Sequence, residues 1–157
     1  MNETNTLPIL YSLRNCPYAM RARIAIFKAQ QTVLLRDLVL SNKPKEMLVA
    51  SPKATVPVIV LADGTVIDES LEVMLWAFNE TDPDDLLHSQ VGDALTKIIG
   101  LINEFDHGFK TSLEQYKCAK RYREDNLDEY RSACALYIKK LEQRLTKHAF
   151  LMSNNED

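Results

Sequence analysis

The fold of this chain is decided near its N-terminus, by the stretch LPILYSLRNCPYAMRARIAIFKA at residues 7–29. Its first part, residues 7–11, is a short apolar run of the length that a strand needs. Residues 17–29 predict a helix, because Pro17 is tolerated in a first helical turn and the alanines that follow recur at helical spacing. Cys16 lies between the two predicted elements, directly before the helix.

Further strands and helices alternate outward from this stretch. In order, the pattern predicts a strand, a short helix, two strands and a helix, over residues 32–39, 43–50, 58–61, 65–67 and 69–78. Asp63-Gly64, between the last two strands, is a strong hairpin signal. The order predicts one mixed sheet with helices on its faces, an α/β domain over residues 1–80.

A second domain is predicted over residues 85–157, after a joint marked by Pro83 and its flanking aspartates. Apolar residues recur at spacings of three and four over residues 87–105 and again over residues 127–145. Such stripes predict two long helices, and hence an all-α domain.

The connection between these two helices is densely charged. Residues 117–125 are therefore expected to form a solvated linker. Asn126 precedes Glu129 by three residues, which is the spacing of a capping box that opens a helix.

Composition excludes several classes of protein. The 157 residues are 46% hydrophobic and 26% charged with few Gly and Pro, which excludes collagen-like and largely disordered chains. A net charge of -3 argues against the usual basic nucleic-acid footprint. No apolar run is long enough to span a membrane, and residues 1–6 lack the pattern of a signal peptide. The three cysteines are therefore expected to be reduced thiols in the cytoplasm.

These cysteines are not equivalent. Cys134 lies on an apolar stripe and is expected to be a small core residue. Cys118 lies in the charged segment, where nothing nearby gives it a chemical task. No cysteine or histidine cluster has metal-ligand spacing, so no metal site is predicted.

Cys16 is placed differently, at the N-terminus of the predicted helix. Free N–H groups and the helix dipole stabilise an anion there, so a thiol ionises more readily than usual. Arg14, Arg21 and Arg23 add positive charge nearby in sequence. Cys16 is thus either a nucleophile or a buried cap of the strand–helix turn. Ala19 occupies the place of the second cysteine of a dithiol motif, so exchange would need an external thiol, for which glutathione is the abundant candidate.

Two later segments could bind such a thiol peptide. Val56-Pro57 lies just before the hairpin, where the backbone before a proline could pair with a peptide-like ligand in strand fashion. Ser70, at the start of a predicted helix, could bind a carboxylate, and Glu69 could accept from an ammonium group. Taken singly, the first is also compatible with a plain turn and the second with an ordinary helix cap.

Together, four segments resemble the bacterial omega-like glutathione S-transferases. They are LYSLRNCPYA at residues 10–19, NKP at 42–44, TVPV at 55–58 and IDES at 67–70. The resemblance implies a thioredoxin-like, glutathione-binding N-terminal domain followed by an all-helical domain. It also implies a homodimer.

The resemblance carries residue roles with it. It implies that Cys16 is catalytic and forms a mixed disulfide with glutathione, the co-substrate. The implied glutathione-binding residues are Lys43 near the glycyl carboxylate, Val56 on the cysteinyl backbone with Pro57 in cis, and Glu69 with Ser70 on the γ-glutamyl end.

The expected function is that of a glutathione-dependent thiol transferase acting on a small-molecule or protein mixed disulfide. Two alternatives remain open: conjugation of glutathione to electrophiles, in which Ser12 or Tyr11 could hydrogen-bond the glutathione thiol, and a non-enzymatic interaction protein on the same fold. The family's helical domain usually has more helices. Ser153 and Glu156 resemble the start of another capping box, so a shortened form is expected, with part of the electrophile site missing.

Overall fold

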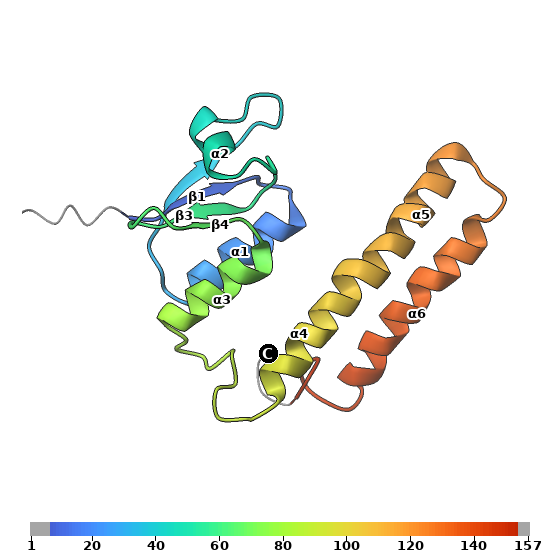
Figure 1. Cartoon of the computed structure of the whole chain (residues 1–157). Helices are drawn as coiled ribbons and strands as arrows, with labels where there is room; N and C mark the ends of the chain where they lie inside the picture. The colour runs from blue at the N-terminus through green and yellow to red at the C-terminus, as the bar shows by residue number, and fades with distance from the viewer. Residues whose placement is uncertain (1–6, 154–157) are drawn as a thin grey trace, which may run out of the picture. The chain divides into compact units, whose positions relative to one another are not determined.

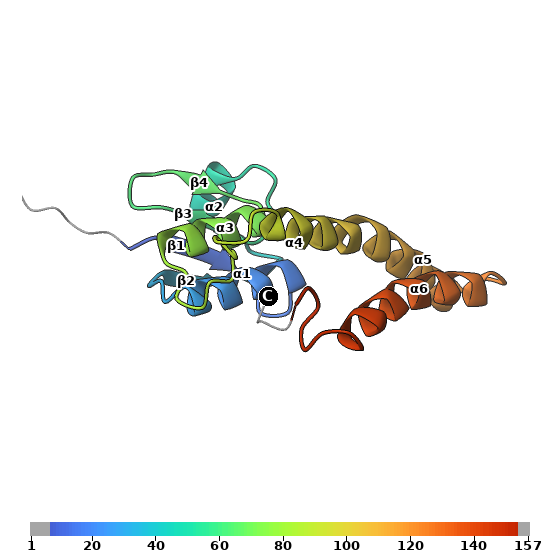
Figure 2. The same ribbon diagram turned by 90° about the horizontal axis from the view of Figure 1, so that it is seen from below.

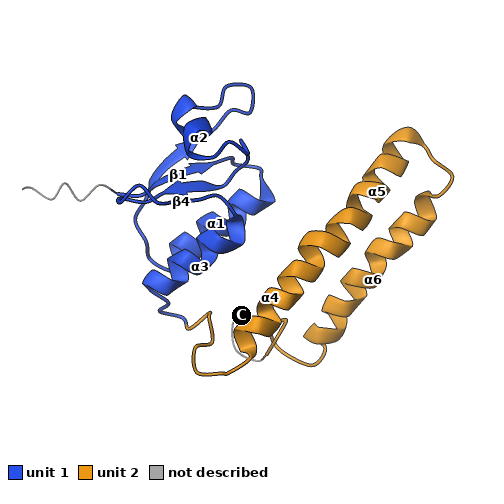
Figure 3. Cartoon of the chain, viewed as in Figure 1, with its two compact units in different colours: residues 1–84 blue, residues 85–157 orange. Residues whose placement is uncertain are grey.

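Two compact units make up the chain, Met1–Asp84 and Asp85–Asp157 (Figure 3). The structure is a computed structural model that describes residues 7–153. Glu156, half of the last predicted capping box, lies outside these residues.

The first unit is built on a four-stranded sheet of order β2-β1-β3-β4. β1 pairs in parallel with β2 and antiparallel with β3, and β3 pairs antiparallel with β4. The strands are β1 (Ile9–Ser12), β2 (Leu34–Asp37), β3 (Val58–Val60) and β4 (Val66–Ile67). The predicted mixed sheet is confirmed.

Helices cover both faces of this sheet, with α1 (Pro17–Lys28) and α3 (Ser70–Glu80) on one side and α2 (Lys45–Ala50) on the other (Figure 1). Because side chains alternate along a strand, Leu10 packs with the helices α1 and α3. The next residue, Tyr11, packs instead with Met47 of α2. Buried alanines on α1, together with Val73 and Ala77 of α3, let these two helices pack closely.

Local signals set the element ends. The helix α2 begins at Lys45 rather than at the predicted residue 43, because the residue before Pro44 is disfavoured in helical conformation. The predicted Asp63-Gly64 turn is present, with Gly64 at a φ of 88° that suits glycine. Thr65 N donates to the Asp63 carboxylate at 2.8 Å and fixes the turn.

The second unit is a helical hairpin. α4 (Ala94–Asn103), a π-helical turn (Glu104–Phe109) and α5 (Lys110–Tyr122) follow one another as a single rod, and α6 (Leu127–Leu145) packs along α5 (Figure 2). The rings of Phe105, Phe109 and Tyr137 cluster at the π turn.

Three sequence-based expectations for this unit are wrong. The first helix begins at Ala94, because residues 85–93 form turns in which Asp85 and His88 adopt positive φ values of 50° and 48°. Residues 117–122 are exposed as expected, except for Ala119, but they are helical rather than a connection between helices, and α5 ends where Arg123 turns left-handed at a φ of 58°. Asn126 does precede α6, but its side chain makes no capping hydrogen bond.

Candidate active site

Cys16 caps the N-terminus of α1. β1 ends at Ser12, a short turn follows, and Cys16 has the extended backbone of a helix cap, with φ -85° and ψ 120°. Pro17 starts the helix, and Met20 N donates to the Cys16 carbonyl at 2.8 Å. The thiol is half-buried and lies at the end of a helix whose first N–H groups have no partner within the helix.

The loop before β3 brings Val56 to this thiol. Cys16 Sγ donates to the Val56 carbonyl oxygen, with 3.8 Å between the two atoms. The Val56–Pro57 peptide bond is cis, as the resemblance implied, and Pro57 is fully buried. The contact needs the thiol proton, so it belongs to the neutral form of Cys16. Forty residues apart in sequence, the predicted nucleophile and the predicted backbone-binding residue are neighbours in the fold.

Tyr11 and Ser12, the alternative thiol-binding residues, do not face solvent. Tyr11 is 7% exposed and Ser12 is 1% exposed. The Ser12 hydroxyl also accepts a hydrogen bond from Arg23. Of these three residues, only Cys16 presents its side chain to a partly open surface.

Glu69 and Ser70 lie at the start of α3. Ser70 is buried, and its hydroxyl accepts from Arg21 Nε at 3.0 Å and from Arg21 Nη2 at 2.7 Å. The Arg21 guanidinium also lies over the ring of Tyr18, 5.0 Å from its centre. A half-buried cation therefore faces the hydroxyl that was predicted to bind a carboxylate.

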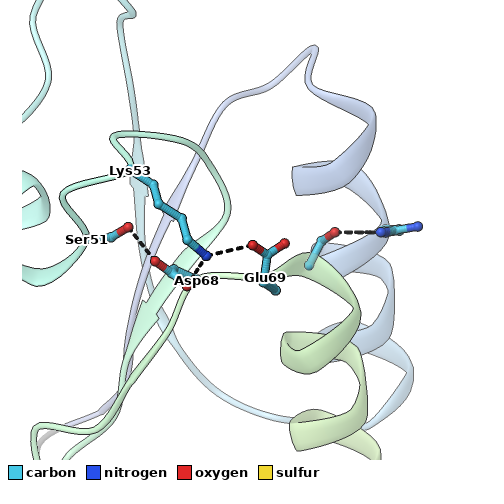
Figure 4. Close-up of polar contacts among 6 residues, drawn as sticks. Ser51, Lys53, Asp68 and Glu69 are labelled. Carbon is cyan, nitrogen blue, oxygen red and sulfur yellow. Dashed lines mark hydrogen bonds and ion pairs between the residues drawn. The ribbon is translucent and has the colours of Figure 1, made fainter. Parts of the chain in front are cut away.

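A polar network among Ser51, Lys53, Asp68 and Glu69 joins the segment after α2 to the start of α3 (Figure 4). Lys53, in the loop that leads to Val56, bonds Asp68 at 3.0 Å and Glu69 at 2.6 Å. The buried Ser51 hydroxyl donates to Asp68 at 2.6 Å. The Ser51 hydrogen bond, and then Lys53, lower the pKa of Asp68 from its ordinary value. Glu69 and then Asp68 raise the pKa of Lys53.

Lys43 is not joined to these groups. It lies half-buried in the turn before α2, and in the described part of the chain none of the other predicted site residues bonds to it. Its assignment to the glycyl carboxylate stays a prediction.

The other two cysteines are in the second unit. Cys118 is exposed on α5 rather than in a linker, and Cys134 is half-buried on α6. Within residues 7–153, no group of three or more acidic, histidine or cysteine side chains is placed to hold a metal ion.

Sequence reasoning missed Lys53 and Asp68 of this site, and it missed the bonding role of Arg21. Arg21 and Arg23 were expected only to add positive charge near the thiol, and the structure also bonds both to oxygen acceptors. Their only signal was position, since Arg21 lies one helical turn after Pro17 and Lys53 lies three residues before Val56.

Comparison with known proteins identifies the first unit. Residues 10–84 match the family model described as the glutathione S-transferase N-terminal domain. Residues 10–84 are therefore similar to a glutathione S-transferase N-terminal domain. The expected resemblance to glutathione S-transferases is thereby confirmed over residues 10–84. No curated protein is significantly similar to the chain in sequence.

Solved glutathione S-transferases share the fold of this chain. An enzyme from the Antarctic clam Laternula elliptica superposes with a TM-score of 0.81 at 16% identity, over 96% of this chain and 71% of that one. A Sulfitobacter homologue with bound glutathione superposes with a TM-score of 0.74 at 14% identity, over 96% of this chain and 76% of that one. The glutathione transferase Omega 2C of Trametes versicolor superposes with a TM-score of 0.70 at 19% identity, over 87% of this chain and 63% of that one. The predicted thioredoxin-like domain followed by a helical domain is confirmed.

Proposed function

We propose that this chain is an omega-like, glutathione-dependent thiol transferase with Cys16 as its nucleophile. One observation carries the proposal: the sulfur of a half-buried cysteine at the start of α1 lies 3.8 Å from the Val56 carbonyl oxygen. Extended backbone beside a thiol is what a thiol peptide needs in order to align its own sulfur with that thiol.

The proposed reaction uses two thiol–disulfide exchanges. The Cys16 thiolate attacks the glutathione sulfur of a mixed disulfide, the substrate S–S bond breaks, and the substrate thiolate leaves and takes up a proton. A second glutathione, as its thiolate, attacks the glutathione sulfur now bonded to Cys16. Glutathione disulfide leaves and the Cys16 thiolate is restored. The substrate sulfur is reduced to a thiol, and one free glutathione is oxidised as it joins the glutathione of the mixed disulfide.

The charges around Ser70 match the γ-glutamyl end of glutathione, which carries both a carboxylate and an ammonium group. We assign the carboxylate to Ser70 and the Arg21 guanidinium, which favours carboxylates because its N–H groups form a planar fork. We assign the ammonium group to Glu69, where it would replace Lys53 as the bonding cation. Val56 with the cis Pro57 would hold the cysteinyl backbone, and Lys43 the glycyl carboxylate. The bound glutathione of the Sulfitobacter homologue supports this choice of co-substrate.

Conjugation to electrophiles is the alternative that the burial of Tyr11 and Ser12 disfavours. Without an exposed hydroxyl from β1, activation of the glutathione thiol would fall to Cys16, which captures the thiol instead of only hydrogen-bonding it. A Cys16→Ser variant separates the two reactions. A thiol transferase loses disulfide reduction and keeps or gains conjugation, whereas a conjugating enzyme never reduced disulfides and loses conjugation in the variant.

A mass measurement tests the nucleophile directly. The protein is mixed with glutathione disulfide, and the modified peptide is located by digestion. We expect one glutathione on Cys16, with Cys118→Ser and Cys134→Ser as matched controls that keep the adduct. Absence of an adduct on Cys16 refutes the thiol transferase and favours a non-enzymatic interaction protein.

The proposal includes a cytoplasmic homodimer. In the described residues, no helix is both long enough and apolar enough to cross a membrane. Light scattering coupled to size exclusion measures the oligomeric state.

A further inference from the structure

Arg23, on α1, binds three consecutive residues of the chain before Cys16. Its Nη1 donates to the Ser12 hydroxyl and, at 3.2 Å, to the Leu13 carbonyl. Its Nη2 donates to the Arg14 carbonyl at 3.0 Å. These acceptors are the last residue of β1 and the first two residues of the turn that leads to the thiol.

The same turn holds the backbone of Cys16. Cys16 N donates to the Leu13 carbonyl at 3.2 Å, so Leu13 receives both the Cys16 amide and the Arg23 guanidinium. A carbonyl oxygen has two lone pairs and can accept both bonds. Movement of Arg23 would therefore affect the Leu13 carbonyl, which also accepts the hydrogen bond from Cys16 N.

We propose that Arg23 is a positioning residue for the Cys16 thiol, which fixes residues 12–15 so that the sulfur stays at the first turn of α1. The inference rests on the proposed function and adds to it a residue that touches neither thiol nor glutathione. Arginine suits the role because one planar fork reaches several acceptors at once, whereas lysine is a single point charge.

A pure charge effect and a purely structural role of Arg23 would each give a different result. If its charge alone favoured the thiolate, lysine would replace it. If Arg23 only stabilised the fold, its substitution would lower the free energy of unfolding and leave the reactivity of the Cys16 thiol unchanged. Positioning predicts that lysine fails although the charge is kept, and that the pH profile of thiol reactivity moves.

The experiment measures alkylation of each cysteine by iodoacetamide between about pH 5 and about pH 10, a range that brackets the ordinary thiol value of about 8.5. The variants are Arg23→Lys and Arg23→Gln, and the matched control is Arg36→Lys on the exposed strand β2. Peptide mass spectrometry resolves Cys16 from Cys118 and Cys134.

We expect both Arg23 variants to alkylate Cys16 about tenfold more slowly at pH 7, the effect of losing one charge-assisted hydrogen bond. The midpoint of the pH profile should move upward, because a sulfur displaced from the helix N-terminus ionises less readily. Rates at the other two cysteines should stay within twofold, and Arg36→Lys should behave like the wild type.

Ser12→Ala provides a second test if an Arg23 variant does not fold. It removes one of the three acceptors and keeps every charge, so we expect a smaller loss in the same direction. The inference is overturned if Arg23→Lys keeps the wild-type rate and pH profile at Cys16 or, where the Arg23 variants do not fold, if Ser12→Ala keeps them. A wild-type Cys16 that reacts no faster than Cys118 would instead refute the proposed function. The two failures are therefore distinguishable.

Discussion

Replacing Arg21 by lysine tests how the γ-glutamyl end of glutathione is recognised. In the structure, Nε and Nη2 of Arg21 converge on Ser70 Oγ, at 3.0 and 2.7 Å. A carboxylate bound at Ser70 meets the same edge of the guanidinium and can accept two parallel hydrogen bonds from it. Lysine keeps the positive charge, but it cannot present two parallel N–H groups in one plane.

The magnitude follows from one lost bond. Hydrogen bonds to charged groups contribute about 1.5 to 3 kcal/mol. At about 1.4 kcal/mol per factor of ten, glutathione affinity should fall by about 10- to 100-fold. Because Arg21 is only half-buried, we expect the lower end of this range.

The assay is calorimetric titration with glutathione in a Cys16→Ser background, where no mixed disulfide can form. Arg36→Lys is the matched control, an exposed arginine in another element. Ser70→Ala should also weaken binding, and the double variant should lose less than the two single losses combined, because both side chains serve one carboxylate. An Arg21→Lys affinity within twofold of the parent, with an unchanged unfolding transition, would show that Arg21 only supports α3.

Three further predictions concern the network, the acidic residue of the motif and the helical unit. Because the pKa of Asp68 is lowered, its ionised form stabilises the fold above the ordinary value of 3.8, and this contribution is lost as the pH falls below that value. The urea stabilities of the wild type and Asp68→Asn should therefore converge toward pH 3 and diverge at pH 6. Parallel curves of stability against pH would contradict this. Glu69→Ala should weaken glutathione binding by about 1.5 to 3 kcal/mol, and unchanged affinity would remove Glu69 from the site. Gly108→Ala should destabilise the protein by about 1 kcal/mol in thermal melts, because a Cβ there would crowd the Tyr137 hydroxyl and the cost of overpacking exceeds the gain in helix propensity. Gly100→Ala, with nothing within 4 Å of the added carbon, is the control, and equal melting of the two variants would contradict the clash.

The first unit was predictable because its signals are local and agree with one another. Pro17 at a helix start and Asp63-Gly64 at a turn each require one conformation, and the strands between them alternate with helices. The second unit was less predictable at its ends. Charge at residues 117–122 indicated a linker, but a helix with one solvated face carries such charges freely, and only Ala119 is buried there.

Those residues of the site that belong to short sequence motifs were predictable. Cys16 and Val56 were chosen from separate segments, and the fold brings them together. The roles of Arg21 and Lys53 were not predicted, because they depend on acceptors that lie 49 and 16 residues away in sequence. A pattern along the chain does not encode such pairings.

The burial pattern decides which spectroscopic signal reports on which half of the molecule. Among the described residues, the buried hydrophobic side chains belong to the first unit, with the exception of Ala119. The single tryptophan, Trp76, packs against the core of that unit. The longest helices, α5 and α6, which dominate a far-ultraviolet circular dichroism signal, belong to the second. Fluorescence thus follows the first unit, whereas dichroism is weighted toward the second, and coincident transitions by the two probes would mean that the units unfold together.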